Sequence, residues 1–180
     1  MTAPVMSAEA AQANKEKQSV ALSSVLAAVL LTGMKLVVGL MTNSLGILSE
    51  AAHSGLDLVA AGVTLYAVRL SAMPPDARHP YGHGKVENLS ALVETLLLLL
   101  TCVWIIHEAV DRLFFHPQPV EASYWGAAIM VISIVVDYTR SRMLMAAARK
   151  HNSQALEADA LHFSTDIWSS LVVLAGLGAL

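Results

Sequence analysis

The sequence predicts an all-α membrane protein, a bundle of five transmembrane helices. Of its 180 residues, 56% are hydrophobic and only 14% are charged, against roughly 25% charged in soluble domains. The mean hydropathy is +0.58. Apolar runs that reach the roughly 20 residues a helix needs to cross a bilayer occur at five places along the chain.

The five expected spans follow one another with short polar breaks between them. They cover residues 20–41, 45–70, 86–114, 123–148 and 156–180. The first two are joined by so few residues that they should form an antiparallel hairpin. A polar loop with three prolines separates the second and third spans, Pro117 and Pro119 mark the next break, and a polar turn at 151–154 precedes the last span.

The basic residues indicate how this bundle is oriented. Nine of the 11 lysines and arginines fall on one side of the expected layout, and such an excess marks the cytosolic face. These nine are Lys15, Lys17, Arg69, Arg78, Lys85, Arg140, Arg142, Arg149 and Lys150. We therefore expect residues 1–18, which are polar and alanine-rich, to be a disordered cytosolic tail, and residues 19–180 to form the transmembrane domain.

Charge and cysteine content exclude several kinds of partner and site. The net charge of −3 and the lack of a basic block give no sign of nucleic-acid binding. With Cys102 as the one cysteine, the chain can form no intrachain disulfide and no cysteine-rich metal site. The run at 20–41 is long enough to remain as a span, so we expect no cleaved signal peptide and place the protein in a bacterial inner membrane.

Two of the expected spans repeat one pattern of ionisable residues. It reads Glu50-x-x-His53-x-x-x-Asp57 in the second span and Asp159-x-x-His162-x-x-x-Asp166 in the fifth. Residues three and four apart share one face of a helix. An ionisable group inside a bilayer costs roughly 2.5–3.5 kcal/mol on insertion scales, so such groups usually serve a function. Further ionisable residues lie in the spans, and their partners are not fixed by the sequence: Lys35, Glu94 and Asp137.

If the two stripes face each other, they bring two imidazoles and two carboxylates together. The four donors are His53, Asp57, His162 and Asp166. One such pair alone is more often a hydrogen bond within a helix, but two matching pairs favour a metal site. This donor set suits tetrahedral Zn²⁺, and it also suits Co²⁺, Ni²⁺, Fe²⁺ or Mn²⁺. Binding would release protons, so metal and protons could occupy the site in turn, as metal/proton antiport requires.

A second cluster lies in the loop between the second and third spans. Asp76, His79 and His83 fall within eight residues, and the neighbouring glycines permit unusual backbone angles. These three side chains could wrap one ion. From the spacing alone, a merely solvated polar loop is an equally good interpretation.

Three segments together resemble the cation diffusion facilitator family of divalent-metal transporters. They are Asn43-Ser44-Leu45 with Ser49-Glu50-Ala51-Ala52-His53-Ser54-Gly55-Leu56-Asp57, then His79-Pro80-Tyr81-Gly82-His83-Gly84-Lys85-Val86-Glu87, and His162-Phe163-Ser164-Thr165-Asp166. The resemblance covers roughly residues 18–180. It implies a six-helix transmembrane domain followed by a cytosolic metal-binding domain, and a homodimer. This chain would correspond to the first five helices.

The resemblance also implies which residues bind metal. His53, Asp57, His162 and Asp166 match the transport site, and the histidine–aspartate pair on both helices resembles the zinc-preferring branch. Asp76, His79 and His83 match an additional loop site that some members have.

The leading function is therefore export of Zn²⁺ from the cytosol in exchange for protons, with no catalytic residue and no organic cofactor. Its partners would be the lipid bilayer, the divalent ion and protons. A truncated membrane fragment that binds metal without transporting it is the main alternative. A haem-binding redox enzyme fits poorly, because haem requires facing histidines in apolar surroundings. An intramembrane metalloprotease would need a motif such as His-Glu-x-x-His, which the sequence lacks.

Overall fold

The computed structural model describes residues 8–114 and 124–178, and these residues form five helices without a strand. The helices are α1 (Ala8–Thr42), α2 (Leu45–Ser71), α3 (Val86–Phe114), α4 (Tyr124–His151) and α5 (Gln154–Gly178). Each lies where the sequence predicts a span, so the all-α, five-helix architecture is confirmed.

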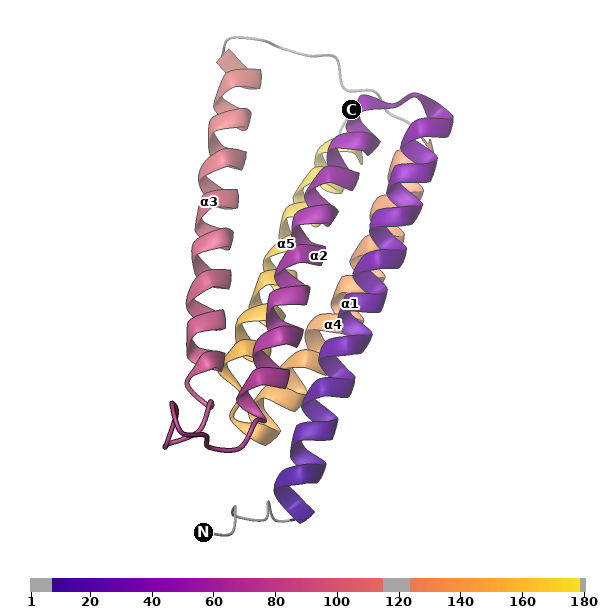
Figure 1. Cartoon of the computed structure of the whole chain (residues 1–180). Coiled ribbons are helices and arrows are strands. Elements are labelled where there is room, and N and C mark those ends of the chain that lie inside the picture. The colour runs from indigo at the N-terminus through magenta and orange to yellow at the C-terminus, as the bar shows by residue number, and fades with distance from the viewer. Residues whose placement is uncertain (1–7, 115–123, 179–180) are drawn as a thin grey trace.

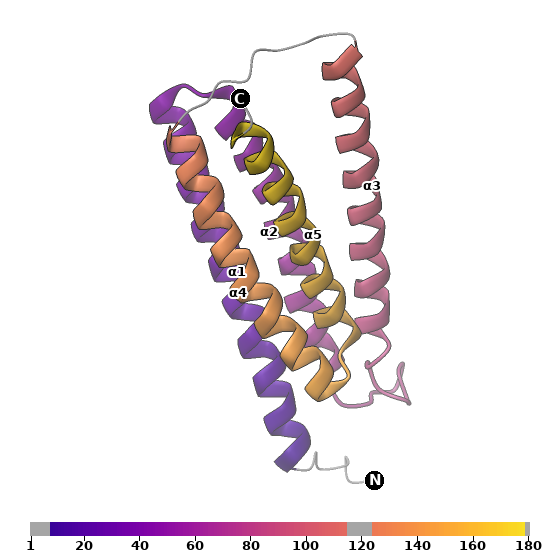
Figure 2. The same cartoon turned by 180° about the vertical axis from the view of Figure 1, so that it is seen from behind.

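The helices run side by side and alternate in direction (Figure 1). One end of the bundle carries the start of α1, the α2–α3 loop and the α4–α5 turn, and we call it the loop end. The α1–α2 turn and the last residues of α5 lie at the opposite end (Figures 1 and 2). The closest pairings are α1 with α2 and α4 with α5, whereas α3 packs on α5 and α2 at the side of the bundle.

Two tight turns of the same composition make the two helix hairpins. Asn43 and Asn152 adopt positive φ angles of 50° and 48°, a conformation that asparagine tolerates better than most residues. A serine follows each asparagine: Ser44 caps the first turn of α2, and the Ser153 hydroxyl accepts a hydrogen bond from the backbone N–H of Leu156 in α5. The sequence thus ends one helix and starts the next within two residues.

The segment expected to be a disordered tail is largely helical, which corrects the prediction for residues 8–18. The helix α1 begins at Ala8 and continues without a break to Thr42. Ion pairs to distant helices hold this extension: Lys17 lies 2.7 Å from Glu87 on α3, and Glu16 lies 2.7 Å from Lys150 on α4. Residues 1–7 lie outside the described residues.

Three helices are long and apolar enough to cross a membrane by length and composition, over Ala8–Thr42, Gly46–Ser71 and Val86–His107. The apolar sequence of α4 is interrupted in its middle by three charged residues, Asp137, Arg140 and Arg142, although the helix itself is continuous. At 28 and 25 residues, α4 and α5 reach about 42 and 37 Å, more than the roughly 30 Å of the hydrocarbon core.

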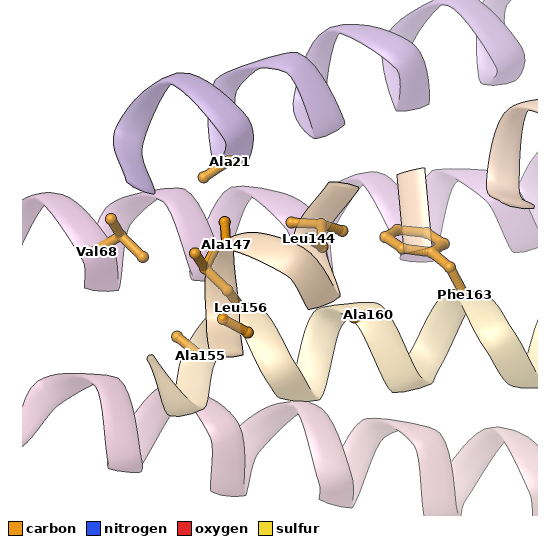
Figure 3. Close-up of a cluster of buried hydrophobic side chains, with 9 residues drawn as sticks. Ala21, Val68, Leu144, Ala147, Ala155, Leu156, Ala160 and Phe163 are labelled. Atoms are coloured by element: carbon orange, nitrogen blue, oxygen red, sulfur yellow. The ribbon is translucent and has the colours of Figure 1, made fainter. Parts of the chain in front are cut away.

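The core lies near the loop end and is built from small and branched side chains. Alanines dominate the cluster, so α4 approaches both α1 and α5 closely; Figure 3 shows Ala21, Val68, Leu144, Ala147, Ala155, Leu156, Ala160 and Phe163. Phe163 is its largest member and is 1% exposed. Because Phe163 adjoins His162 in sequence, this cluster fixes the part of α5 that carries the candidate metal ligands.

Candidate metal centre

Four ionisable side chains from α2 and α5 meet in the interior of the bundle. The Nε2 atom of His53 lies 3.9 Å from Oδ1 of Asp57 and 3.7 Å from Oδ1 of Asp166. The Nε2 atom of His162 lies 3.3 Å from Oδ1 of Asp57 and 3.5 Å from Oδ2 of Asp166. Each histidine therefore contacts an aspartate on its own helix and one on the other helix.

Three of these residues, His53, Asp57 and Asp166, have donor atoms that all lie within 4.8 Å of one another, as a shared metal ion requires. With metal–ligand bonds of about 2.0–2.2 Å, neighbouring donors in a tetrahedron lie about 3.4 Å apart. The four contacts span 3.3 to 3.9 Å. His162 contacts both aspartates but lies outside this group of three, so a bond from its imidazole to the same ion requires a movement of the side chains.

The four donors differ in their exposure. The side chain of His162 is 5% exposed and that of Asp57 is 12% exposed, whereas His53 retains 24%. The ring of Phe163 packs against that of His162 at 5.6 Å between centroids. Because α5 is held by this packing, we expect His53 to be the ligand with the most freedom to move.

The first acidic residue of each repeated pattern lies outside this cluster. Glu50 has a half-exposed side chain and lies 3.3 Å from the Nζ atom of Lys35 on α1. Asp159 accepts a 3.4 Å hydrogen bond from the Ser24 hydroxyl, also on α1. The two patterns share a spacing, but only the histidine and the second acid of each converge.

The structure also gives partners to the interior ionisable residues that the sequence left unpaired. Lys35 donates to Ser54 at 2.7 Å as well as to Glu50. Asp137 pairs with Arg140 one turn along α4, at 3.2 Å. Arg140 was not among the sequence-predicted site residues, yet it is buried next to the site and its guanidinium carbon lies 3.6 Å from the centroid of the Phe163 ring. Its position inside an otherwise apolar span is the signal that could have indicated it.

The three residues of the loop cluster also lie together. Oδ1 of Asp76 is 3.2 Å from Nδ1 of His79, and Oδ2 is 3.4 Å from Nε2 of His83. The two imidazole rings are 4.4 Å apart between centroids. Asp76 and His79 are exposed, whereas the side chain of His83 is 10% exposed.

The backbone organises this loop without help from an ion. Oδ1 of Asp76 accepts hydrogen bonds from the N–H groups of His79, at 2.6 Å, and Arg78, at 2.8 Å. The bond from His79, more than the bond from Arg78, holds the pKa of the Asp76 carboxyl below its ordinary value. Gly82 turns the chain back with a φ of 81°. Asp76 is therefore preorganised as a charged, outward-facing oxygen donor.

Comparison with known proteins places this geometry in a family. A family model described as the cation efflux transmembrane domain matches residues 21–180. The chain belongs to the cation efflux family. This confirms the resemblance to the cation diffusion facilitators at family level, and the cation efflux assignment makes the chain an integral membrane protein of a transporter family.

Several curated proteins share this cation efflux domain. The chain is 35% identical over 154 residues to "Uncharacterized transporter sll1263" of Synechocystis, covering 86% of the chain and 49% of that protein. It is 31% identical over 155 residues to "Cation-efflux pump FieF" of Shewanella oneidensis, covering 86% and 52%. It is 31% identical over 168 residues to "Manganese efflux system protein MneP" of Bacillus subtilis, covering 93% and 56%. The chain thus spans about half the length of the curated relatives it matches.

Proposed function

We propose that this cation efflux protein exports Zn²⁺ from the cytosol and binds it through His53, Asp57, His162 and Asp166. The observation that carries the proposal is the meeting of two imidazole and two carboxylate donors at 3.3 to 3.9 Å between α2 and α5. Nitrogen and oxygen donors in a set of four favour zinc among the divalent ions. Relatives named for manganese efflux make Mn²⁺ the principal competitor.

In this proposal, protons are transported in the direction opposite to Zn²⁺. A metal ion binds neutral imidazole and ionised carboxylate, so its arrival expels protons from the same side chains. Proton entry from the outer side would then release the metal there. The proposed orientation has the N-terminus and the loop end in the cytosol of a bacterial inner membrane, as seven of the nine basic residues favour; Arg140 and Arg142 lie in the middle of α4.

The loop cluster of Asp76, His79 and His83 lies at the loop end, where cytosolic metal would arrive. We assign it the capture of metal before transport. Its exposure supports this role, because Asp76 and His79 are each more than half exposed while their donor atoms already lie within 3.2 Å. The proposal further includes a homodimer as the assembled form.

Flux through proteoliposomes tests the transport site. The full chain is reconstituted with a zinc-sensitive dye and a pH-sensitive dye inside the vesicles, and zinc is added outside. We expect zinc uptake with opposite proton movement, and loss of both in Asp57→Ala and Asp166→Ala. The matched control is Glu157→Ala, which removes an exposed carboxylate from α5 away from the site.

The outcomes separate the alternatives. Full zinc flux in the two aspartate variants would show that the site assignment is wrong. If the unmodified chain bound metal but carried no flux, its function would be metal binding without transport. Repeating the measurement with Mn²⁺, Co²⁺, Cd²⁺ and Fe²⁺ ranks the ions, and faster transport of Mn²⁺ than of Zn²⁺ would overturn the zinc preference.

A further inference from the structure

Two carboxylates on the loop side of the candidate metal centre are more deeply buried than its ligands. Glu94 on α3 is 1% exposed and Asp159 on α5 is 0% exposed, against 9% for Asp57. Asp159 precedes His162 by one helical turn toward the loop end. Glu94 lies eight residues after the start of α3, about 12 Å from the loop end. The two carboxylates are close enough for their charges to interact.

The two oxygens of Glu94 differ in their hydrogen bonding. Its Oε1 atom accepts from the hydroxyls of Thr64 on α2, in a very short contact, and of Ser90, at 3.3 Å. Its Oε2 atom is buried and has no partner among residues 8–114 and 124–178. A charged carboxylate would thus be buried with one oxygen that receives no hydrogen bond, which costs more free energy than burying the neutral acid.

Within the described residues, no lysine or arginine forms an ion pair with Glu94. From α5 it faces Asp159 and His162, from α2 only the Thr64 hydroxyl, and on α3 only Ser90. Arg140 on α4 is turned to Asp137, at 3.2 Å, and reaches Asp159 only through the Ser24 hydroxyl. In the described part of the chain, the Arg140 guanidinium lies beside Asp137 and Asp159, and no ion pair joins it to Glu94. A buried carboxylate without a cation takes up a proton instead.

We propose that Glu94, Asp159, Thr64 and Ser90 form a second site, whose ligand is a proton held on Oε2 of Glu94. This site is separate from the four metal ligands, and proton occupancy does not depend on what the protein transports. Its role in transport rests on the proposed function. A divalent ion at His162 and its neighbours adds positive charge nearby, so Glu94 gives up its proton to solvent and remains as a carboxylate.

Infrared difference spectroscopy tests the occupancy directly. The full chain in nanodiscs, free of metal at neutral pH, is expected to show the C=O stretch of a buried protonated carboxylic acid, with the frequency shift in D₂O that identifies it. Glu94→Gln should lose this band, and Glu157→Gln, a matched change on the exposed face of α5, should keep it. Thr64→Val removes a donor to the C=O oxygen and should move the band to higher frequency.

Two results would overturn the proton site: no such band in the unmodified chain, or a band that neither Glu94→Gln nor Thr64→Val alters. Thr64→Val keeps the test decisive if Glu94→Gln fails to fold. The coupling is measured separately, as protons released when Zn²⁺ is added in weak buffer. Glu94→Gln should release about one proton fewer per chain, and an unchanged count would overturn the coupling. If the unmodified chain bound no metal, the proposed function would be wrong. The infrared C=O band would still show whether Glu94 holds a proton, because that measurement uses the metal-free protein.

Discussion

The Nε2 atom of His162 on α5 lies 3.3 Å from the Oδ1 atom of Asp57 on α2, although the two residues are 105 positions apart in the chain. This contact joins the two helix hairpins in the interior of the bundle. The same nitrogen lies 3.5 Å from Asp166. His162, like His53, therefore contacts both aspartates of the site, and at shorter distances.

Replacing His162 by alanine should weaken zinc binding strongly. The change leaves the carboxylates of Asp57 and Asp166 with the imidazole of His53 alone. Loss of a hydrogen-bond partner behind a metal ligand already lowers metal affinity about 10- to 100-fold, and loss of a ligand itself should cost at least as much. Isothermal titration calorimetry with Zn²⁺ measures this. His107→Ala, which removes an exposed histidine from α3, should bind as the unmodified chain does; equal losses in both variants would contradict the assignment.

Glu87 should stabilise the loop end of the bundle. Its carboxylate accepts from Lys17 on α1 and Ser71 on α2, each at 2.7 Å, and from Ser153 at the start of α5 in a very short contact. Glu87→Ala should lower the free energy of unfolding by about 1.5–3 kcal/mol, since hydrogen bonds to a buried charge are lost. Thermal unfolding followed by circular dichroism measures the change.

Glu16→Ala is the matched control for that variant. Glu16 also bridges helices, through Lys150 and His151, but it is exposed to solvent. Ion pairs on the surface contribute little, so the unfolding temperature of Glu16→Ala should stay close to that of the unmodified chain. If Glu16→Ala destabilised the bundle as much as Glu87→Ala, burial would not be the deciding factor.

The close approach of α1 and α2 depends on Gly39. A Cβ atom at this position would lie 2.8 Å from Cδ2 of Leu48 and 3.2 Å from its backbone nitrogen. Gly39→Ala should therefore force the two helices apart and lower stability by about 1 kcal/mol. At Gly33 on the same helix nothing lies within 4 Å, so Gly33→Ala should be neutral or stabilising by about 0.5–1 kcal/mol, because alanine favours the helix. The two unfolding temperatures should move in opposite directions, and a common shift would contradict the packing argument.

The loop cluster should lose its order in acid. The pKa of Asp76 is lowered in the folded chain, first by the N–H of His79 and then by that of Arg78. Its contribution is therefore complete above the ordinary value of about 3.9 and is lost as the pH falls through the lower value of the folded protein. Amide hydrogen exchange and chemical shifts of Arg78 and His79 measure this. Asp76→Asn retains an oxygen acceptor but does not titrate, so its amides should show a flat response; a midpoint above the ordinary pKa would disprove the stated direction.

The helices could be predicted from the sequence because membrane-spanning helices need apolar length, which is a local property. The segments 45–70 and 86–114 correspond to α2 and α3 within one residue. The tail at 8–18 was wrongly predicted because its order comes from contacts with residues far along the chain, such as Lys17 with Glu87. Spacing alone shows no such partner.

The candidate site was predictable as far as helical periodicity reaches. His53 and Asp57 share a face whatever the fold, and so do His162 and Asp166. That the two faces meet, and that Glu50 turns away to Lys35, depends on how the helices pack. The interior partners of Glu94 and Arg140 were likewise beyond the sequence, since hydroxyls of Thr64, Ser90 and Ser24 supply them from other turns or other helices.

The two asparagine–serine turns have a mechanical consequence. Each turn makes a rigid pair of helices, and each pair supplies two donors: His53 and Asp57 from one, His162 and Asp166 from the other. The candidate metal ligands are thus divided equally between the α1–α2 hairpin and the α4–α5 hairpin. In the proposed site, a slide of one hairpin against the other would separate the two pairs of donors, so we expect ion release without the breaking of a helix.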